Sequence, residues 1–207
     1  MPALVIDLSG QWQLVELGGA HCAAMTVPGD VHSALVAANI IPHTYNGRNE
    51  ALVQWVAHSD WTLSREFELA APVLSEGWYL DVDYLDTVAE IRVNEVLVLE
   101  AANCFRRYRP DVSSALKVGL NRIEITFRSN IAAAVALQSS QPFYVPYSSS
   151  NCPIPHVNML RKPQCHFGWD WNIAIAPFGL YGKIQLKRMA LARVEHVQVF
   201  QDIAGDF

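Results

Sequence analysis

Apolar and polar residues alternate along several short stretches of this chain. An alternation with a period of two places one side of an extended strand on a core and the other side toward solvent. Short strands joined by turns, without a regular succession of strands and helices, indicate an all-β fold built as an antiparallel β-sandwich. The strands predicted in this way are Trp61–Leu69, Trp78–Tyr84, Ala89–Val93, Leu120–Phe127 and Lys183–Lys187.

Two short helices interrupt the strand pattern. Asp30 is a suitable N-cap for a helix over residues 31–39, because a carboxylate can accept a hydrogen bond from the first turn. An alanine-rich stretch, Asn130–Gln138, predicts the second helix. The apolar face expected on the first helix consists of Val31, Ala34, Leu35 and Ala38.

Turns, a long loop and a linker separate these elements. Asn94-Glu95 lies between two short apolar runs and is expected to form a tight hairpin turn. Prolines and serines interrupt every periodic pattern from Pro142 to Pro163, which predicts a long loop. Near the end, Val194–Phe200 alternates again. We therefore expect one sandwich domain over residues 1–190, followed over 191–207 by a linker and the first strand of a second, truncated domain.

The composition limits the class of protein. The chain has 207 residues, of which 51% are hydrophobic and 17% charged, as in a globular protein. The net charge of −5 argues against a nucleic-acid partner, which would need a basic face. The longest apolar run, Ile131–Leu137, is too short to cross a membrane, and the first residues show no secretory signal. Together with the absence of glycosylation sequons, these features favour a cytoplasmic location.

The cysteines and histidines follow no strong metal-binding pattern. Cys152, His156, Cys165 and His166 match no common zinc spacing, and two of the four would be adjacent ligands. The four cysteines of the chain are also scattered without a disulfide framework, which fits a reducing compartment. We expect neither a metal nor another cofactor.

Trp169-Asp170-Trp171 is the most informative stretch for function. An indole offers a flat apolar face that can stack on the C–H side of a sugar ring, and a carboxylate accepts hydrogen bonds from hydroxyls. The three residues are therefore candidate sugar-binding residues. Their alternative interpretation is a buried tryptophan pair with Asp170 capping a turn.

Several segments occur in the order found in one known family. They are Leu8–Leu14, Val27–Leu35, Asn49-Glu50 with Val53–Trp55 and Trp61, Leu85–Asn94, and Arg161–Gln164 with Phe167–Trp171. Together they resemble the N-terminal sugar-binding, jelly-roll-like domain of glycoside hydrolase family 2, and most closely its β-mannosidase branch. The chain departs from the family pattern at Asn172-Ile173, where Gly-Pro is usual, at Glu95, where Gly is usual, and at His43, where Asp is usual.

The resemblance implies a galactose-binding-domain-like sandwich that belongs to a retaining exo-β-mannosidase acting on terminal, non-reducing β-D-mannose. In this family two catalytic glutamates lie on a (β/α)₈ barrel, which follows a small immunoglobulin-like domain. A barrel takes about 250 residues, so residues 191–207 cannot contain one, and we expect no catalytic residue in this chain and no activity from it alone. Trp169, Asp170 and Trp171 would reach toward the barrel and bind the mannose.

Further residues receive structural interpretations from the same resemblance and from their context. Glu50 is expected to hold a loop by hydrogen bonds, and His32 to bond the backbone. Arg161 and Lys162 could approach a substrate, but they are rather expected to pair with acids where the domain docks on the barrel. One of the two indoles of the Trp-Asp-Trp run is expected to lie in the core. The basic cluster Arg106, Arg107 and Arg109 is expected to form a solvated strand face.

Alternative functions remain at this point. The chain could be a self-contained carbohydrate-binding module, a structural module that docks other domains, or part of a sister enzyme such as a β-galactosidase, β-glucuronidase or exo-glucosaminidase, because a fold does not fix a substrate. If the chain is made alone, the surface expected to face the barrel would be exposed and apolar, which predicts self-association.

Overall fold

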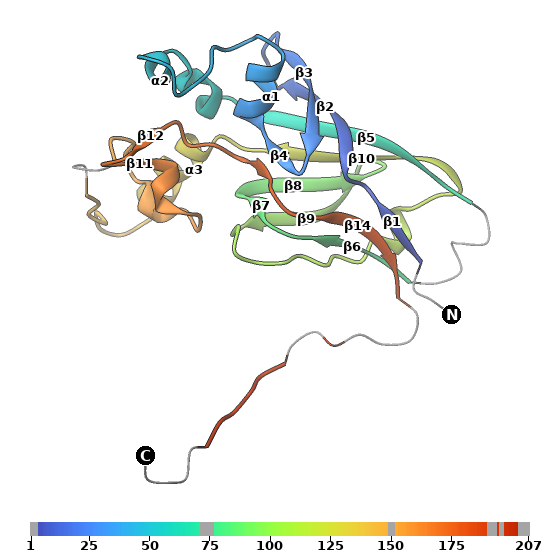
Figure 1. The fold of residues 1–207 in the computed structure, drawn as a ribbon. Coiled ribbons are helices and arrows are strands. Elements are labelled where there is room, and N and C mark those ends of the chain that lie inside the picture. The colour runs from blue at the N-terminus through green and yellow to red at the C-terminus, as the bar shows by residue number, and fades with distance from the viewer. Residues whose placement is uncertain (1–3, 71–76, 149–151, 190–193, 195–196, 203–207) are drawn as a thin grey trace.

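The structure, a computed structural model, describes residues 4–70, 77–148, 152–189, 194 and 197–202. These residues form strands in antiparallel sheets with a few short helices, which confirms the predicted fold class (Figure 1). The strands are β1 (Val5–Asp7), β2 (Gly10–Glu16), β3 (Cys22–Val27), β4 (Gly29–Asp30), β5 (Trp61–Leu69), β6 (Trp78–Val82), β7 (Leu85–Asp86), β8 (Val88–Val93), β9 (Val96–Ala102), β10 (Gly119–Phe127), β11 (Phe167–Trp169), β12 (Asn172–Ala174), β13 (Gly179–Leu180) and β14 (Ile184–Arg188). The helices are α1 (Val31–Ala37), α2 (Asn49–Leu52) and α3 (Asn130–Ser139), with short 3₁₀ turns at η1 (Gln54–His58), η3 (Ser113–Ala115), η4 (Val157–Met159) and η5 (Gln164–His166).

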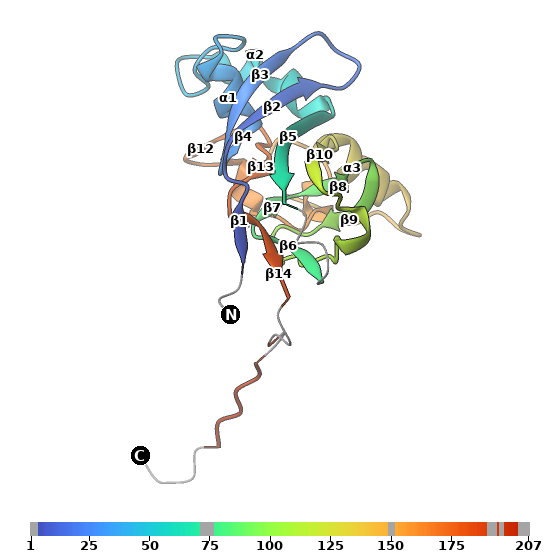
Figure 2. The same ribbon diagram turned by 90° about the vertical axis from the view of Figure 1, so that its right-hand side faces the viewer.

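The strands form a sandwich of two layers. One layer is a six-stranded sheet in the order β3-β2-β5-β10-β8-β9. The three-stranded sheets β1-β14-β6 and β4-β13-β7 form the facing layer (Figures 1 and 2). The two-stranded β11–β12 hairpin stands apart from both layers, at the end of the sandwich where α3 also lies (Figure 1). The sandwich is therefore the scaffold, and the hairpin projects from one end of it.

The core follows the alternation seen in the sequence. Along β10, every second side chain from Asn121 to Phe127 is buried, and the strand pairs with β5 on one side and β8 on the other. Trp61, Trp78 and Phe178 are among the largest fully buried side chains. Burial of apolar surface stabilises a fold by roughly 25 cal/mol per Å², so this continuous core supplies the main driving force for folding.

The predicted helices and hairpin turn are confirmed, with one local error. Asp30 caps α1 as expected, since its Oδ1 accepts a hydrogen bond from Ser33 N at 2.9 Å. Ala38, expected on the buried face, is exposed because α1 ends at Ala37 and Ala38 is its C-cap. Asn94 and Glu95 form the β8–β9 turn with φ of 47° and 71°, the positive values that a tight two-residue hairpin turn requires.

The C-terminal prediction stays open. The strand expected over Val194–Phe200 lies partly outside the described residues, and Val194 and residues 197–202 have no assigned strand or helix. Among the described residues, no helix is long and apolar enough to cross a membrane.

A buried ion pair connects the sandwich to the segment that leads into the hairpin. Lys162 Nζ lies 3.1 Å from Asp86 Oδ2, and both side chains are fully buried. The same ammonium donates a hydrogen bond of 2.6 Å to the Pro177 carbonyl and lies 5.2 Å from the centre of the Phe167 ring. Burial lowers the pKa of Lys162, and the charge of Asp86 opposes that shift. The expectation that Lys162 pairs with acids at a domain interface is therefore wrong, because its partner is an acid of its own domain.

Removal of the Lys162 charge should destabilise the fold strongly. Lys162→Met leaves Asp86 buried without its cation, which costs roughly 3–5 kcal/mol of the free energy of unfolding. The matched control is Arg122→Gln, which breaks the partly exposed Arg122–Glu124 pair at 2.8 Å and should change stability by about 1 kcal/mol or less. Urea unfolding followed by circular dichroism measures both, and equal losses in the two variants would contradict this assignment.

A second charge cluster lies on β6 and β14. Asp81, whose side chain is 4% exposed, accepts two hydrogen bonds of 2.5 Å from Arg107 and one from Lys187. Arg109 Nε lies 3.6 Å from the same carboxylate. Burial alone would raise the pKa of Asp81, but the hydrogen bonds from Arg107 and Lys187 outweigh it and lower the pKa to about 2. Arg106 and Arg107 are exposed, as expected of a solvated face, but Arg107 and Arg109 also neutralise a buried acid.

The stabilisation by Asp81 should disappear in acid. The pKa of Asp81 in the folded state lies below its usual value of 3.8. Asp81 therefore contributes its full stabilisation above about pH 4, and this stabilisation is lost as the pH falls toward about 2. Asp81→Asn should therefore lower the free energy of unfolding by on the order of 1 kcal/mol near neutral pH, with a difference that shrinks below about pH 4. Denaturant unfolding across this pH range measures it, and a difference that is independent of pH would refute the role.

Candidate functional site

The candidate sugar-binding residues meet at the tip of the β11–β12 hairpin. Trp169 pairs with Asn172, and Asp170 and Trp171 form the turn between the two strands. Trp169 is 41% exposed and Trp171 is 77% exposed, and Asp170 is exposed as well. The two indole rings lie 5.5 Å apart, centre to centre, with an interplanar angle of 57°. The structure thus presents two aromatic faces and one carboxylate together on an accessible tip.

The expectation that one indole lies in the domain core is wrong. A two-residue turn places the residue before it and the residues within it at the end of the hairpin, away from both layers of the sandwich. The alternative of a buried tryptophan pair is excluded for the same reason. Neighbouring exposed aromatic side chains are typical of a surface that binds a ligand or another protein.

Glu50 and Gln54 hold the base of the hairpin. The backbone N–H of Ala174, the last residue of β12, donates to Glu50 Oε1 at 2.8 Å. Gln54 Nε2 donates to the Ala174 carbonyl at 2.8 Å and to the Glu50 carbonyl at 2.9 Å. The backbone N–H and carbonyl of Ala174 are thereby hydrogen-bonded to side chains of α2 and η1. The expectation that Glu50 holds a loop by hydrogen bonds is confirmed.

Asn172 fixes the hairpin from two further directions. Its Nδ2 donates to the Cys165 carbonyl at 2.8 Å, and its Oδ1 accepts from Tyr45 Oη at 3.0 Å. The sequence departs from the family pattern at this position, and the departure has a structural consequence, since a glycine could make neither contact. Tyr45 was not recognised from the sequence, because only the fold brings it next to the hairpin.

A cavity of about 310 Å³ lies beside the hairpin. Its wall includes Trp169, Gln164 of η5 and residues of the long loop, namely Pro146, Tyr147, Ser148, Cys152, Val157 and Asn158. Gln164 organises this loop, because its Nε2 donates to the Leu160 and Lys162 carbonyls at 3.3 and 3.1 Å. The predicted loop is therefore ordered by specific hydrogen bonds where it is described, and it continues the surface that Trp169 begins.

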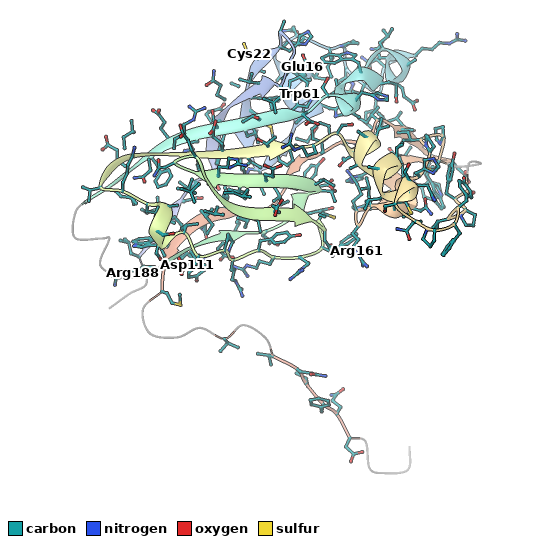
Figure 3. All side chains as sticks on the ribbon, turned by 180° about the vertical axis from the view of Figure 1, so that it is seen from behind. Glu16, Cys22, Trp61, Asp111, Arg161 and Arg188 are labelled. Atoms are coloured by element: carbon teal, nitrogen blue, oxygen red, sulfur yellow. The ribbon has the colours of Figure 1, made fainter. Side chains whose placement is uncertain are left out.

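Arg161 and Lys162 are neighbours in sequence with opposite environments. Lys162 is buried in the ion pair described above, whereas the Arg161 side chain is exposed and projects outward (Figure 3). The Arg161 backbone bridges to Asn103, and its carbonyl accepts from Cys104 N at 3.0 Å. Burial raises the pKa of the Cys104 thiol to about 11, so this cysteine stays protonated at neutral pH. Of the two basic residues, only Arg161 is available to a ligand.

The histidines and cysteines of the described residues do not assemble into a metal site. No group of three or more His, Cys, Asp or Glu side chains in this part of the chain is placed to hold an ion. His32, expected to bond the backbone, is buried with no hydrogen-bond partner for either ring nitrogen among the described residues, so that expectation is wrong.

Several large apolar side chains are exposed on α3, on the loop that follows it and on the hairpin tip. They are Val135, Leu137, Phe143, Tyr144, Trp169 and Trp171. We refer to these six residues as the aromatic end.

Comparison with known proteins places the chain in a family. The family model described as "Glycosyl hydrolase 2 galactose-binding domain-like" matches residues 12–182. The chain therefore belongs to this glycoside hydrolase family 2 domain family, which confirms the resemblance noted in the sequence.

Individual relatives are consistent with this family. The chain is 34% identical to a β-mannosidase from Bos taurus over 189 residues, which cover 88% of this chain and 21% of the relative. It is 30% identical to a probable β-mannosidase from Caenorhabditis elegans over 88% of its own length. A crystal structure of a β-D-mannosidase from Dictyoglomus thermophilum superposes with a TM-score of 0.85 at 27% identity and covers 93% of this chain. The chain spans about a fifth of the length of these relatives.

The hydrogen bond between the hairpin and Glu50 can be tested directly. Glu50→Ala removes the acceptor for Ala174 N–H, and a hydrogen bond to a charged group contributes about 1.5–3 kcal/mol. Amide exchange at Ala174 should therefore accelerate by roughly 10- to 100-fold. Glu50→Gln keeps an acceptor oxygen and should retain most of the protection. Equal exchange rates in the wild type and in both variants would show that the contact does not hold the hairpin.

Proposed function

We propose that this chain is the N-terminal, substrate-shaping domain of a retaining exo-β-mannosidase that removes terminal β-D-mannose from the non-reducing end of its substrate. One observation carries the proposal. Trp169, Asp170 and Trp171 are presented together and exposed on a hairpin, on a domain that is similar to the corresponding part of β-mannosidases. Sugar sites combine aromatic walls with a few placed polar groups, and the hairpin tip has both.

Each residue of the hairpin tip has a distinct task in this proposal. Asp170 accepts hydrogen bonds from hydroxyl groups of the mannose, and an exposed indole, from Trp171 or Trp169, forms an apolar wall against its C–H face. These contacts bind and orient the sugar and break no bond. Two glutamates on a barrel elsewhere in the full enzyme would carry out hydrolysis, one as nucleophile and one as acid/base, without a cofactor.

The anchoring of the hairpin supports this role. Glu50, Gln54 and Asn172 fix its base through hydrogen bonds of 2.8 Å to backbone groups. A site held before the ligand arrives loses less conformational freedom on binding, so more of the contact energy remains for orientation. The tip would therefore meet the sugar in one conformation.

The aromatic end suits contact with the rest of such an enzyme. We propose that it docks within the same protein against the barrel, so that the hairpin tip closes one side of the sugar pocket. The apolar exposure of Phe143, at 66%, and of Tyr144, at 60%, supports a covered surface. A cytoplasmic location is part of the proposal and is supported by four free cysteines.

Hydrolysis of 4-nitrophenyl-β-mannoside tests the proposed function. The 207-residue chain should be inactive, and a gene product that continues past Phe207 into a barrel should be active. Activity in the 207-residue chain itself would contradict the absence of catalytic residues. Activity in neither protein would favour a sister glycosidase, or a carbohydrate-binding module that only binds.

The role of Asp170 is tested in the longer gene product that contains the barrel and is expected to be active. Asp170→Asn keeps the shape of the side chain but removes its charge. A hydrogen bond to a charged group contributes about 1.5–3 kcal/mol. The loss of one such bond should therefore lower kcat/KM by roughly 10- to 100-fold. The matched control is Glu95→Gln at the tip of the β8–β9 hairpin, which should leave kcat/KM unchanged. Similar values for wild type and Asp170→Asn would remove Asp170 from the site.

Self-association tests the docking surface. The 207-residue chain made alone should associate reversibly at high concentration, because the aromatic end is then uncovered. Trp171→Ser combined with Phe143→Ser should shift the sedimentation coefficient to that of the monomer, whereas Val118→Ser, at another exposed apolar side chain, should not. A wild-type chain that is a single monomeric species at high concentration would contradict the prediction.

A further inference from the structure

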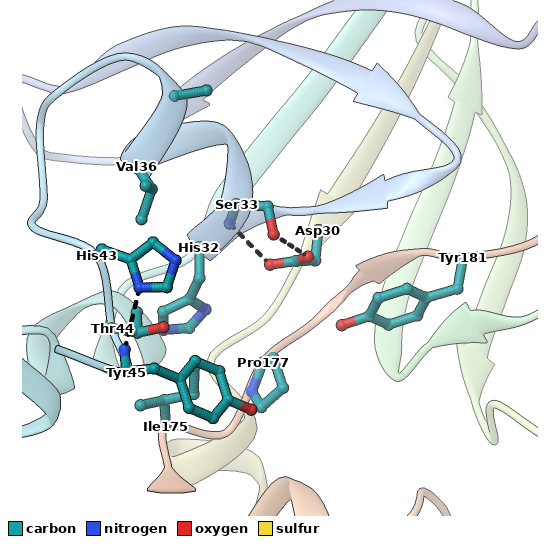
Figure 4. A pocket seen from close by; sticks show the side chains of 11 residues that line it. Asp30, His32, Ser33, Val36, His43, Thr44, Tyr45, Ile175, Pro177 and Tyr181 are labelled. Carbon is teal, nitrogen blue, oxygen red and sulfur yellow. Dashed lines mark hydrogen bonds between the residues drawn. The ribbon is translucent and has the colours of Figure 1, made fainter.

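A second cavity opens next to the hairpin, separate from the tip. It has a volume of about 420 Å³ and lies between α1, the segment that follows α1, and the segment from β12 to β13 (Figure 4). Tyr45 connects the two places, because its ring lines the cavity and its hydroxyl donates to Asn172 of the hairpin at 3.0 Å. The lining residues that carry polar side chains are Asp30, His32, Ser33, His43, Thr44, Tyr45 and Tyr181.

His32 is the unexplained group in this cavity. The residue is 2% exposed and lines the cavity wall, yet neither Nδ1 nor Nε2 has a hydrogen-bond partner among the described residues. Its ring meets Phe178 edge to face at 6.1 Å, so packing holds it in place. Burial lowers the pKa of His32 to about 4, which keeps the imidazole neutral at neutral pH. A neutral imidazole has one N–H donor and one nitrogen acceptor, and a buried group with both unused requires a partner.

The other polar groups of the cavity are also suited to hydroxyl groups. Asp30 Oδ1 accepts from Ser33 N at 2.9 Å and Oδ2 accepts from Ser33 Oγ at 2.6 Å, and each oxygen has a lone pair left. The Tyr181 hydroxyl is directed toward Asp30 and Pro177 (Figure 4). Burial, together with the charges of Asp30 and Asp86, raises the pKa of Tyr181, so that its hydroxyl stays protonated and can donate.

The chemistry of the lining narrows the class of ligand. The Asp30 carboxylate repels anions, and no side-chain cluster in the described part of the chain can hold a metal ion. Val36, Ile175 and Pro177 contribute apolar wall between the polar groups. A hydroxyl group donates and accepts at once, so it can satisfy both functions of a neutral imidazole as well as a carboxylate and a phenol.

We propose that this cavity binds a neutral polyhydroxylated ring of about the size of one sugar residue, with His32, Asp30 and Tyr181 as its hydrogen-bonding groups. Its volume lies within the range of about 300–1,000 Å³ typical of small-molecule sites. The ring can come from a free monosaccharide or from a further residue of a glycan held at the hairpin tip. The choice of mannose as the probe rests on the proposed function. The existence of the cavity and its lining do not depend on that proposal.

Saturation-transfer difference NMR on the 207-residue chain tests the proposal, because this chain is expected to lack the residues that would hydrolyse the probes. The probes are methyl β-D-mannoside and a β-linked mannobiose, each at millimolar concentration, and the background variant is Trp171→Ala, which removes an indole from the hairpin tip. A signal that persists in this background and is lost in His32→Leu and in Tyr181→Phe supports the cavity site. Tyr79→Phe, on β6 and outside the cavity lining, is the matched control and should retain the signal.

The outcomes separate this inference from the proposed function. A signal from both probes in the Trp171→Ala background indicates a free monosaccharide site, and a signal from mannobiose alone indicates a residue of a longer glycan. A signal that Trp171→Ala abolishes, or that both cavity variants retain, overturns the cavity site while leaving the hairpin tip as the sugar site. Absence of signal from either probe in the wild type also overturns it and leaves ordered water as the partner of His32. Unchanged thermal unfolding of Tyr181→Phe establishes that a loss of signal is not a loss of fold.

Discussion

The buried pair of Lys162 and Asp86 is the interaction on which the hairpin end of this domain depends. Asp86 belongs to the sandwich, and Lys162 belongs to the loop that leads into the hairpin. The ammonium also binds the Pro177 carbonyl just after the hairpin, so one side chain connects the segments on both sides of it to the scaffold. An ion pair removed from water pays a large desolvation cost, and it persists only where geometry and further hydrogen bonds compensate. In this protein the ion pair carries that desolvation cost and holds an irregular segment in a fixed position.

With its base fixed, the hairpin can expose residues that would otherwise be buried. An isolated two-stranded hairpin has little stability of its own. The contacts of Glu50, Gln54 and Asn172 supply what the short strands lack. The result is an anchored tip that presents aromatic faces and a carboxylate on the surface, with the sandwich behind it as support.

The same anchoring places two different polar environments close together. The tip is exposed and aromatic, whereas the cavity beside α1 is lined by a neutral imidazole that has no hydrogen-bond partner in the described part of the chain. Tyr45 spans them through its hydrogen bond to Asn172. Under the proposed function, the fold alone does not fix which sugar is bound, and local groups such as these would set the choice.

The sequence alone determined the regular part of this protein. Alternation identified the strands around Trp61–Leu69 and Leu120–Phe127, the cap at Asp30 and the turn at Asn94-Glu95, because these depend on neighbours a few residues away. The ordered motifs also indicated the family, and Trp169-Asp170-Trp171 was recognised as the candidate site. Only the tertiary structure decided that both indoles are exposed, that Lys162 pairs within its own domain and that His32 has no hydrogen-bond partner among the described residues. Those outcomes depend on which distant segments meet, and a side chain's partner and exposure are fixed only when the whole chain has packed.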